Sequence, residues 1–275
     1  MLGEKNENQS QVTILGARGS VPVSGAQFSR YGTATACVLL ETASAAVIFD
    51  AGTGMMNLPK RVWKQHKKVH LFLSHFHIDH LLGALLSPIL YDGEAEVVCY
   101  TSDVEKLRQA LGQMMEKPLW PVGTESYDAK ITYKNLGASP YRIEGSPVTV
   151  SYLPVKHPGG ALAYRAEWGE HSMVYATDCE LDEQGSRELE AFAGDTELFI
   201  LDAQYTKEEY GRYQGYGHSS VEDAASVIAK SGAGQGLLFH HAPNRTDRQL
   251  AEIETMLQQQ WNHIGIAKEG DKILL

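Results

Sequence analysis

The stretch VHLFLSHFHIDH, residues 69–80, places three imidazoles and a carboxylate directly after an apolar run. Its first half, 69–74, is short and continuously apolar, which is typical of a strand covered on both faces. Ordinary core packing has no use for so many metal-ligating side chains at the end of such a strand. The density of the cluster therefore predicts a metal site, and histidines on a surface loop are the weaker interpretation.

The spacing within this cluster indicates which of its side chains would bind the same metal ion. Alternate residues of an extended segment project the same way, so His75 and His77 are expected to share one metal ion. A turn into a helix that begins near Leu81 would direct Asp79 and His80 toward a second ion. These are too many ligands for one tetrahedral ion, so the sequence predicts a dinuclear centre.

Short apolar runs of the strand type recur along the whole chain. Strands are predicted at 11–15, 36–41, 45–50, 69–74, 97–102, 148–155, 173–178, 198–203 and 236–241. Helices are predicted at 55–66, 103–116, 220–231 and 247–261. Because both halves of the chain run from strands into helices, the order favours a layered helix/sheet/sheet/helix architecture.

Two regions have clear local signals. Before the predicted helix 220–231, Ser219 and Glu222 have the spacing of a capping box, and Gly232 lies where a C′ glycine ends a helix. The stretch 117–147 is rich in Pro, Gly, Ser and Tyr. That composition predicts a loop or hairpin insertion there.

Composition describes a folded, acidic protein. Of 275 residues, 43% are hydrophobic, and 34 Asp and Glu stand against 24 Lys and Arg, a formal net charge of -10. This content suffices for a substantial core, and without repeats or a low-complexity linker the chain 1–275 is predicted to form a single domain. The excess of carboxylates, with no run of five basic residues, argues against a long nucleic acid as ligand.

The sequence also bears on the compartment. The stretch 1–10 is polar and lacks the apolar core of a secretory signal, and the apolar stretch 81–91 is too short to span a bilayer. Cys37, Cys99 and Cys179 are odd in number and irregularly spaced, which disfavours a disulfide framework. A cytoplasmic protein without membrane contact is expected.

Further candidate ligands stand at the ends of other predicted strands. His157 follows VSYLPVK, Asp178 ends MVYATD and His240 ends GLLFH. Sites in α/β proteins are commonly built where strands end. Singly, each of these residues is most simply structural. Beside the cluster at 75–80, they can supply the third nitrogen that each ion needs and an anionic bridge between the ions.

The segment HFHIDH (75–80) resembles the HxHxDH signature of the metallo-β-lactamase superfamily. The neighbouring motifs fall in the order of that family: Asp50 in FDAGTG, His157, Asp178 in ATDCE and His240 in FHHAP. The similarity extends from residue 15 to about residue 248. It implies an α/β fold, a four-layer αββα sandwich with a dinuclear metal site at the sheet edge.

Three further motifs are similar to the phosphodiesterase branch of the family, which includes ribonuclease Z and cyclic phosphodiesterases. They are GARGSVPVSG (16–25), RYGTATACV (30–38) and GHSS (217–220). The chain departs from ribonuclease Z in one respect, because it has no long Gly/Pro-rich arm for gripping transfer RNA. Together with the charge of -10, this departure argues against transfer-RNA processing.

The resemblance implies a ligand for each position of a dinuclear centre. One metal would be held by His75, His77 and His157, the other by Asp79, His80 and His240, with Asp178 bridging them. His240 and His241 compete for the last position; His240 is preferred because it ends the apolar strand, which leaves His241 beside the ligands or near substrate. Asp50 matches a family carboxylate that supports the site from behind.

His218 matches the histidine of the branch's GHSS motif, which lies near the substrate phosphate as a proton donor. Asp79 and His218 are therefore the candidate catalytic residues. Cys179, next to the bridging position, is expected to be buried or supporting and not a ligand. Imidazole and carboxylate ligands fit two divalent ions per chain, Zn²⁺ best, with Mn²⁺ or Fe as alternatives.

These features predict a metal-dependent hydrolase, a two-metal phosphodiesterase acting on a small or cyclic nucleotide or a similar phosphodiester. Metal-bound hydroxide would attack the anionic phosphorus, and His218 would protonate the poor leaving alkoxide. Two alternatives stay open: hydrolysis of a carboxylic ester, thioester or lactone by the same centre, and a non-catalytic member of the fold that binds a small molecule. The expected partners are a small anionic phosphodiester and, from the family resemblance, a second copy in a homodimer.

Overall fold

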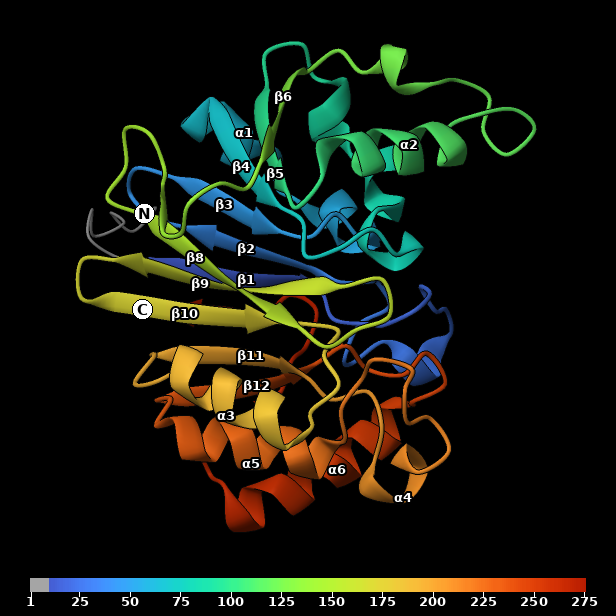
Figure 1. Ribbon diagram of the computed structural model, residues 1–275. Helices are drawn as coiled ribbons and strands as arrows, with labels where there is room; N and C mark the ends of the chain where they lie inside the picture. Colours follow the sequence, from blue (N-terminus) through green and yellow to red (C-terminus); the bar gives the residue numbers. More distant parts are fainter. Residues whose placement is uncertain (1–9) are drawn as a thin grey trace, which may run out of the picture.

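Two mixed β-sheets lie face to face in the computed structural model, which describes residues 10–275 (Figure 1). The first sheet has the strand order β14 (Lys272–Leu274), β1 (Gln11–Gly16), β2 (Cys37–Glu41), β3 (Ala46–Phe49), β4 (Lys68–Phe72), β5 (Glu96–Thr101) and β6 (Lys130–Asn135). The second has the order β13 (Ile264–Ile266), β12 (Gln235–Phe239), β11 (Leu198–Asp202), β10 (His171–Ala176), β9 (Ala161–Trp168), β8 (Thr149–Val155) and β7 (Tyr141–Arg142). The prediction that the polar stretch 1–10 is not a secretory signal concerns residues that, up to residue 9, lie outside the described part of the chain.

Helices cover the outer face of each sheet (Figure 1). The first sheet is covered by α1 (Lys60–His66) and α2 (Val104–Met114). The second is covered by α3 (Glu183–Phe192), α5 (Val221–Ser231) and α6 (Asp247–Gln260), and the short α4 (Lys207–Tyr210) contacts α5. The predicted four-layer αββα sandwich is therefore confirmed.

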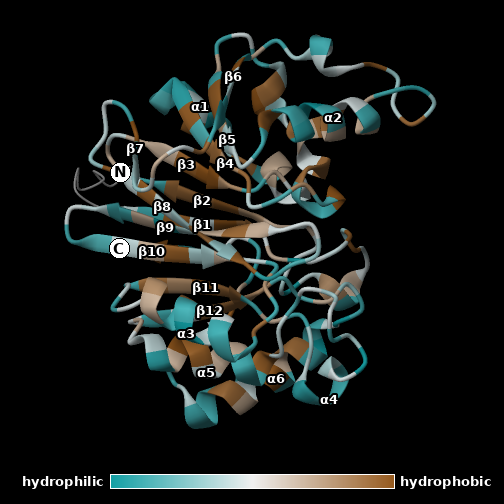
Figure 2. Ribbon diagram, in the orientation of Figure 1, coloured by the Kyte–Doolittle hydropathy of each residue, from teal (hydrophilic) through white to brown (hydrophobic). Residues whose placement is uncertain are grey.

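The central strands of both sheets are apolar on both faces because each sheet lies between two other layers. In β2, Val38 and Leu40 enter the cluster between the sheets, while Cys37 and Leu39 enter the cluster beneath α1 and α2. Figure 2 shows the strands at the centre of the molecule in brown. Each fully buried side chain of this size contributes roughly 1.5–3 kcal/mol by leaving water, so these layers hold the strand ends firmly in place.

Every predicted strand is present, with ends within two residues of the prediction. The helix predicted at 55–66 is wrong in one respect, because it is divided at Pro59. A 3₁₀ turn, η2 (Thr53–Asn57), precedes it and α1 follows it. Leu58 is extended, with a ψ of 119°, as steric contact with a following proline ring requires.

The helix predicted to begin near Leu81 is also wrong. The chain forms two 3₁₀ turns instead, η3 (Ile78–His80) and η4 (Leu82–Leu85). The amide of Gly83 donates to the carbonyl of Ala51 at 2.8 Å, and the amide of Ala51 donates to the carbonyl of His80 at 2.9 Å. These bonds to the loop after β3 replace the hydrogen bonds of a regular helix and hold the histidine segment against the first sheet.

The start of α5 differs by one residue from the predicted capping box. Ser220, not Ser219, is the N-cap, and its side chain accepts from the amide of Asp223. The hydroxyl of Ser219 donates instead to the carbonyl of Cys179. Gly232 ends the helix in the left-handed conformation, with φ 77°, as predicted.

The segment 117–147, predicted as a loop or hairpin insertion, contributes an edge strand to each sheet. Within it, β6 pairs in parallel with β5, and β7 pairs with β8 in an antiparallel hairpin. The remaining strands and helices that the sequence pattern did not indicate are β9, β13, β14, α3 and α4.

Candidate metal centre

All the predicted ligands lie together where strands of the two sheets end. The segment from His75 to His80 follows β4 of the first sheet, and His157, Asp178 and His240 follow β8, β10 and β12 of the second. The ligand atoms form groups, within each of which all atoms lie within 4.8 Å of one another. The groups are His75, His77, His157 and Asp178; Asp79, His80 and His240; and Asp178, His218 and His240.

Asp178 lies between the first two groups. Its Oδ1 is 3.7 Å from the Nε2 atoms of both His75 and His157. Its Oδ2 is 3.1 Å from Nε2 of His80 and 3.2 Å from Nε2 of His240. One carboxylate therefore presents one oxygen to each group, which is the placement that a ligand shared by two cations needs.

The outer nitrogens of four histidines are fixed by neighbouring groups. Nδ1 lies near the Ser74 hydroxyl in His75 (2.9 Å), the Asp50 carboxylate in His80 (2.8 Å), the Gly217 carbonyl in His157 (2.8 Å) and the Gln204 amide oxygen in His240 (2.9 Å). Such contacts set the tautomer and the ring orientation of metal-binding histidines. They direct each Nε2 toward the cluster.

Two of those inner nitrogens have no hydrogen-bond partner among residues 10–275. Nε2 of His75 and Nε2 of His80 are buried and make no hydrogen bond of good geometry, although Asp178 oxygens lie 3.7 Å and 3.1 Å away. A buried polar atom without a partner costs about 1–3 kcal/mol, and a metal ion at this position would remove that cost. The donor set, imidazoles with carboxylates, is also the one that Zn²⁺ and related ions prefer. The residues present thus fit a dinuclear metal centre.

The protonation states agree with this fit. Burial lowers the pKa of His75, and burial likewise lowers the pKa of His77 and His157, so these imidazoles are neutral. Burial acts to raise the pKa of Asp178, but His240 and His80 outweigh it and hold that pKa well below its usual range. Neutral imidazole and ionised carboxylate are the forms that bind metal.

His80 behaves differently from the other histidines. Burial opposes its charge, yet Asp178, Asp79 and Asp50 raise its pKa well above the ordinary value. The three carboxylates thus create a site where positive charge is strongly favoured. The same charges would attract a divalent cation to the inner nitrogen of His80.

Asp50 lies behind this histidine, as the family resemblance implied. It is fully buried and accepts hydrogen bonds from the Ser74 amide at 2.7 Å, the Ser74 hydroxyl at 2.8 Å and the Tyr175 hydroxyl at 2.8 Å, besides contacting His80. Both carboxylate oxygens are therefore engaged, Oδ1 by the Ser74 amide and Oδ2 by the other three groups. Asp50 orients His80 and the start of the histidine segment together.

Three residues of the centre have left-handed backbone conformations. Asp50, Asp178 and His240 have φ values of 63°, 52° and 61°, each directly or closely after a strand. Such conformations cost about 1–3 kcal/mol each in residues other than glycine, and they concentrate at functional sites. The sharp turns direct these side chains out of the sheets and into the centre.

His218 lies at the edge of the cluster and is paired with Asp202. Its Nδ1 is 3.0 Å from Oδ2 of Asp202, and its ring stacks on that of His240 at a centroid distance of 4.9 Å. Burial lowers the pKa of His218, but Asp202, followed by Asp178 and Asp79, raises it to about 9. His218 therefore carries a positive charge at neutral pH.

Asp202 was not among the residues predicted from the sequence. It ends β11, is fully buried, and also accepts from the amides of Cys179 and Gln204 at 3.2 Å each. Its position near the end of an apolar run could have indicated Asp202, because Asp178 was predicted from the same kind of position. Three adjacent strands of the second sheet thus end in side chains of the candidate centre: Asp178 after β10, Asp202 on β11 and His240 after β12.

Glu180 and Gly217 also support the centre without a signal in the sequence. The amide of Gly217 donates to Oε2 of Glu180 at 3.2 Å, while its carbonyl accepts from His157. Gly217 has φ 88°, and a Cβ there would lie 2.2 Å from Nδ1 of His157. Only glycine fits between these two groups. Glu180 therefore orients His157 through the backbone of residue 217.

His241 and Cys179 lie outside the three groups. Nε2 of His241 is 2.8 Å from the carbonyl of Ala267, in a buried position away from the ligand atoms. Sγ of Cys179 is buried and lies 3.9 Å from the carbonyl of Ala176. His240 is the one of the two adjacent histidines that joins the groups.

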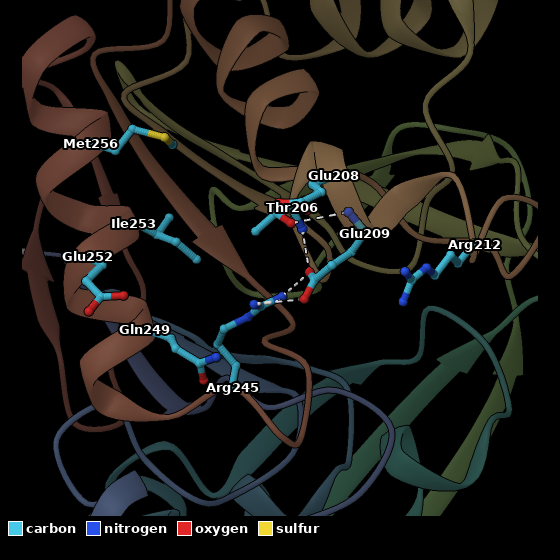
Figure 3. A pocket seen from close by; sticks show the side chains of 9 residues that line it. All are labelled: Thr206, Glu208, Glu209, Arg212, Arg245, Gln249, Glu252, Ile253 and Met256. Atoms are coloured by element: carbon cyan, nitrogen blue, oxygen red, sulfur yellow. Dashed lines mark hydrogen bonds and ion pairs between the residues drawn. The ribbon is translucent and has the colours of Figure 1, made fainter.

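A separate cavity of about 500 Å³ opens between α4 and α6 (Figure 3). Arg245 and Glu209 form an ion pair inside it, and Arg245 also lies within 3.5 Å of the carbonyl of Gln204. Glu208 and Glu252 outweigh the remaining cation, Arg212. None of the predicted ligands lines this cavity, so it does not form part of the centre.

A family model, the beta-lactamase superfamily domain, matches residues 45–241, from the start of β3 to the histidine pair after β12. The chain belongs to the metallo-β-lactamase superfamily. The residues matched include every member of the three ligand groups, and the HxHxDH signature of the superfamily accounts for the four ligands after β4.

Relatives of this metallo-β-lactamase chain include two proteins with different descriptions. The "Probable metallo-hydrolase YhfI" of Bacillus subtilis is 24% identical, over 94% of this chain and 98% of that protein. The "Ribonuclease Z" of Gemmatimonas aurantiaca is 25% identical, over 83% of this chain and 86% of that protein.

Solved structures share the fold. The metallo-β-lactamase fold protein YhfI from Bacillus subtilis matches with a TM-score of 0.71 and 20% identity, over 98% of this chain and all of that one. A diphosphatase from the PhnP family matches with a TM-score of 0.67 and 20% identity, over 96% and 97% of the two chains. Within residues 10–275, no helix is both long and apolar enough to cross a membrane.

Proposed function

We propose that this metallo-β-lactamase chain is a hydrolase that uses two divalent ions, Zn²⁺ by preference, to cleave a small phosphodiester. The observation that carries the proposal is the position of Asp178 between two imidazole groups, with the Asp202–His218 pair at the edge of the same cluster. A cationic imidazole beside a two-metal site suits a reaction with an anionic substrate and a poor leaving group.

The candidate ligands would bind the two ions in two groups that share Asp178. His75, His77 and His157 would hold one ion, Asp79, His80 and His240 the other, and Asp178 both. When bound, the two ions would neutralise the substrate's non-bridging oxygens and lower the pKa of a water molecule. Asp79 is held in place by the amide of Ser20, which donates to its Oδ2 at 2.7 Å.

His218 would supply the proton for the leaving oxygen. Asp202 engages Nδ1, so Nε2 is the nitrogen that donates to substrate. Asp202, which is not among the proposed metal ligands, contributes most to raising the pKa of His218 and so favours the protonated ring. A positioned general acid of this kind contributes typically ~10²–10⁴-fold to the rate.

Two further points support a small phosphodiester. One relative is described as a ribonuclease Z, and a structure of the same fold is described as a diphosphatase. Both names refer to cleavage at phosphorus. The formal charge of -10 disfavours binding along an extended polynucleotide, so a substrate that enters the local positive field of two ions is preferred.

A panel assay tests the proposal. Metal-loaded protein is incubated with a cyclic nucleotide, a linear dinucleotide, bis-p-nitrophenyl phosphate, a lactone and a thioester, and bound metal is counted by elemental analysis. We expect two ions per chain and hydrolysis confined to phosphodiesters. Hydrolysis of the lactone or the thioester alone would assign the centre to acyl transfer, and turnover of none would favour a binding protein.

A further inference from the structure

Three tyrosines form a continuous ring stack that begins at the proton donor of the centre. Tyr205 meets the ring of His218 edge-on at a centroid distance of 6.0 Å. Tyr213 lies flat on Tyr205, at 4.5 Å with an interplanar angle of 7°. Tyr216 meets Tyr213 edge-on at 5.7 Å. We call these three residues the tyrosine stack.

The inner end of the stack is fixed to a metal-binding group. Gln204 donates from its Nε2 to the Tyr205 hydroxyl at 3.2 Å, and its Oε1 lies 2.9 Å from Nδ1 of His240. One side chain thus contacts both the stack and a candidate ligand. The position of Tyr205 relative to the centre is therefore set by direct hydrogen bonds.

The outer end is held by the backbone of the loop after α4. The amide of Tyr213 donates to the carbonyl of Tyr210 at 2.9 Å, and the amide of Tyr216 donates to the carbonyl of Tyr213 at 3.1 Å. The amide of Gly215 donates to Oε2 of Glu180 at 2.7 Å. These bonds order the loop before any ligand binds, which lowers the entropy lost on binding.

Exposure increases along the stack. Tyr205 is 7% exposed, Tyr213 37% and Tyr216 61%. The inner ring is thus a packed support, and the outer two present aromatic surface to solvent. Packing of the loop accounts for the positions of Tyr205 and of one face of Tyr213. It does not account for Tyr216, whose ring is mostly exposed to solvent. Exposed aromatic rings are one feature with which proteins bind nucleobases, since every base has a stacking face.

We propose that Tyr213 and Tyr216 form a subsite for a nucleobase, so that the substrate of the centre is a nucleoside phosphodiester. The inference rests on the proposed function for its phosphate chemistry, but the subsite stands on the stack alone. Because the stack starts at His218, a base on its outer rings would lie on the proton donor's side of the metal centre. Stacking on aromatic side chains does not read base identity, so purines and pyrimidines would both be accepted.

A binding experiment on the metal-loaded protein tests the subsite without requiring turnover. Adenosine 5′-monophosphate and ribose 5-phosphate share a sugar and a phosphate and differ in the base. Isothermal titration calorimetry with both ligands is expected to show adenosine 5′-monophosphate binding about 5- to 150-fold more tightly, the range that corresponds to one stacked base. Equal affinities, including binding of neither ligand, would overturn the proposal.

Variants assign the preference to the stack. Tyr216→Ala and Tyr213→Ala are expected to bring the affinity ratio toward one while leaving ribose 5-phosphate binding unchanged. Tyr216→Phe keeps the ring without the hydroxyl and is expected to keep the ratio. An unchanged ratio in both alanine variants, or an equal loss for the two ligands, would show that the stack only packs the loop.

The two proposals fail in different ways. If the base preference depends on Tyr216 and no diester is hydrolysed, the subsite stands and the proposed phosphodiesterase function fails. If diesters are hydrolysed with no preference for a nucleoside and no effect of Tyr216→Ala on binding, the function stands and the subsite is rejected.

Discussion

The two halves of the metal centre are built from the same kinds of side chain but differ in charge and in access. The half with His75, His77 and His157 has neutral imidazoles and meets only one carboxylate oxygen, Oδ1 of Asp178, at 3.7 Å. His77 is exposed to solvent. This half is therefore the open one, where substrate can approach the centre.

The half with Asp79, His80 and His240 is fully buried. Here Oδ2 of Asp178 lies within 3.2 Å of both imidazoles, and Oδ2 of Asp79 is 3.3 Å from His80 and 3.2 Å from His240. Asp50 adds a third carboxylate behind His80. More negative charge at lower dielectric holds a cation more tightly, so we expect the buried half to bind its ion more strongly than the open half.

Asp178 is the residue on which both halves depend, and its replacement is expected to have the largest effect. Asp178→Ala should lose both ions and reduce activity by at least ~10³-fold, since metal ions contribute several kcal/mol and about 1.4 kcal/mol is a factor of ten. Elemental analysis and turnover of bis-p-nitrophenyl phosphate measure the two losses. Cys179→Ala, at the adjacent buried position, is the control and should retain two ions.

Loss of His218 should separate chemistry from metal binding, because this ring lies beside both halves. His218→Ala is expected to keep two ions and to lose ~10²–10⁴-fold in kcat. The loss should be smaller for a p-nitrophenyl ester than for an alkyl ester, whose leaving oxygen needs the proton more. Equal losses on the two esters would assign His218 to substrate binding and not to proton donation.

The difference in affinity between the halves can be tested by stepwise removal of metal with a chromogenic chelator. We expect release in two steps, with the open half losing its ion first. Asp50→Asn should weaken the tighter step by ~10–100-fold, the usual effect of removing a group that orients a ligand. Glu94→Gln, which removes an equal charge from an exposed site, should change neither step. A single release step in the wild type would contradict the asymmetry.

A smaller effect concerns a buried histidine outside the centre, which contrasts with His80. His70 of β4 has no carboxylate partner, and burial lowers its pKa to about 4. The unfolded chain takes up this proton near pH 6.5 and the folded chain does not, so stability is retained above pH 6.5 and falls as the pH drops toward 4.

The expected loss is about 1 kcal/mol at pH 5.5. His70→Gln keeps a polar partner for the hydroxyl of Tyr100 and should reduce the dependence of unfolding free energy on pH between 6.5 and 4. The measurement is urea unfolding at several pH values. Identical profiles for the variant and the wild type would show that His70 is protonated in the folded state as well.

The proximity of the candidate ligands could be predicted because they are local signals at predictable places. The segment HFHIDH is recognisable within six residues, and His157, Asp178 and His240 follow apolar strands. A layered α/β fold brings the ends of such strands to one edge, so position along the chain was sufficient to predict proximity. The same reasoning would have found Asp202.

Other features depend on contacts that no local pattern contains. Gln204 acts on His240 across 36 positions of sequence, and Glu180 acts on His157 through the backbone of Gly217. Each is an ordinary polar residue until the fold places it. Leu81 failed as a helix start for a similar reason. The amide of Gly83 bonds to the carbonyl of Ala51 in the loop after β3, and the residues around it form a 3₁₀ turn in place of a regular helix.

The division of the ligands between two sheets has a consequence for assembly of the protein. Each ion would be held by the first sheet through the segment after β4 and by the second sheet through residues after β8, β10 or β12. Neither sheet alone presents a complete set of ligands, so metal would bind only after the two sheets have packed together. The bound ions would then act as cross-links between the two sheets. Metal present at 100 times its dissociation constant adds about 2.7 kcal/mol per ion against unfolding. Scarcity of metal would therefore shorten the lifetime of the folded chain as well as abolish its activity.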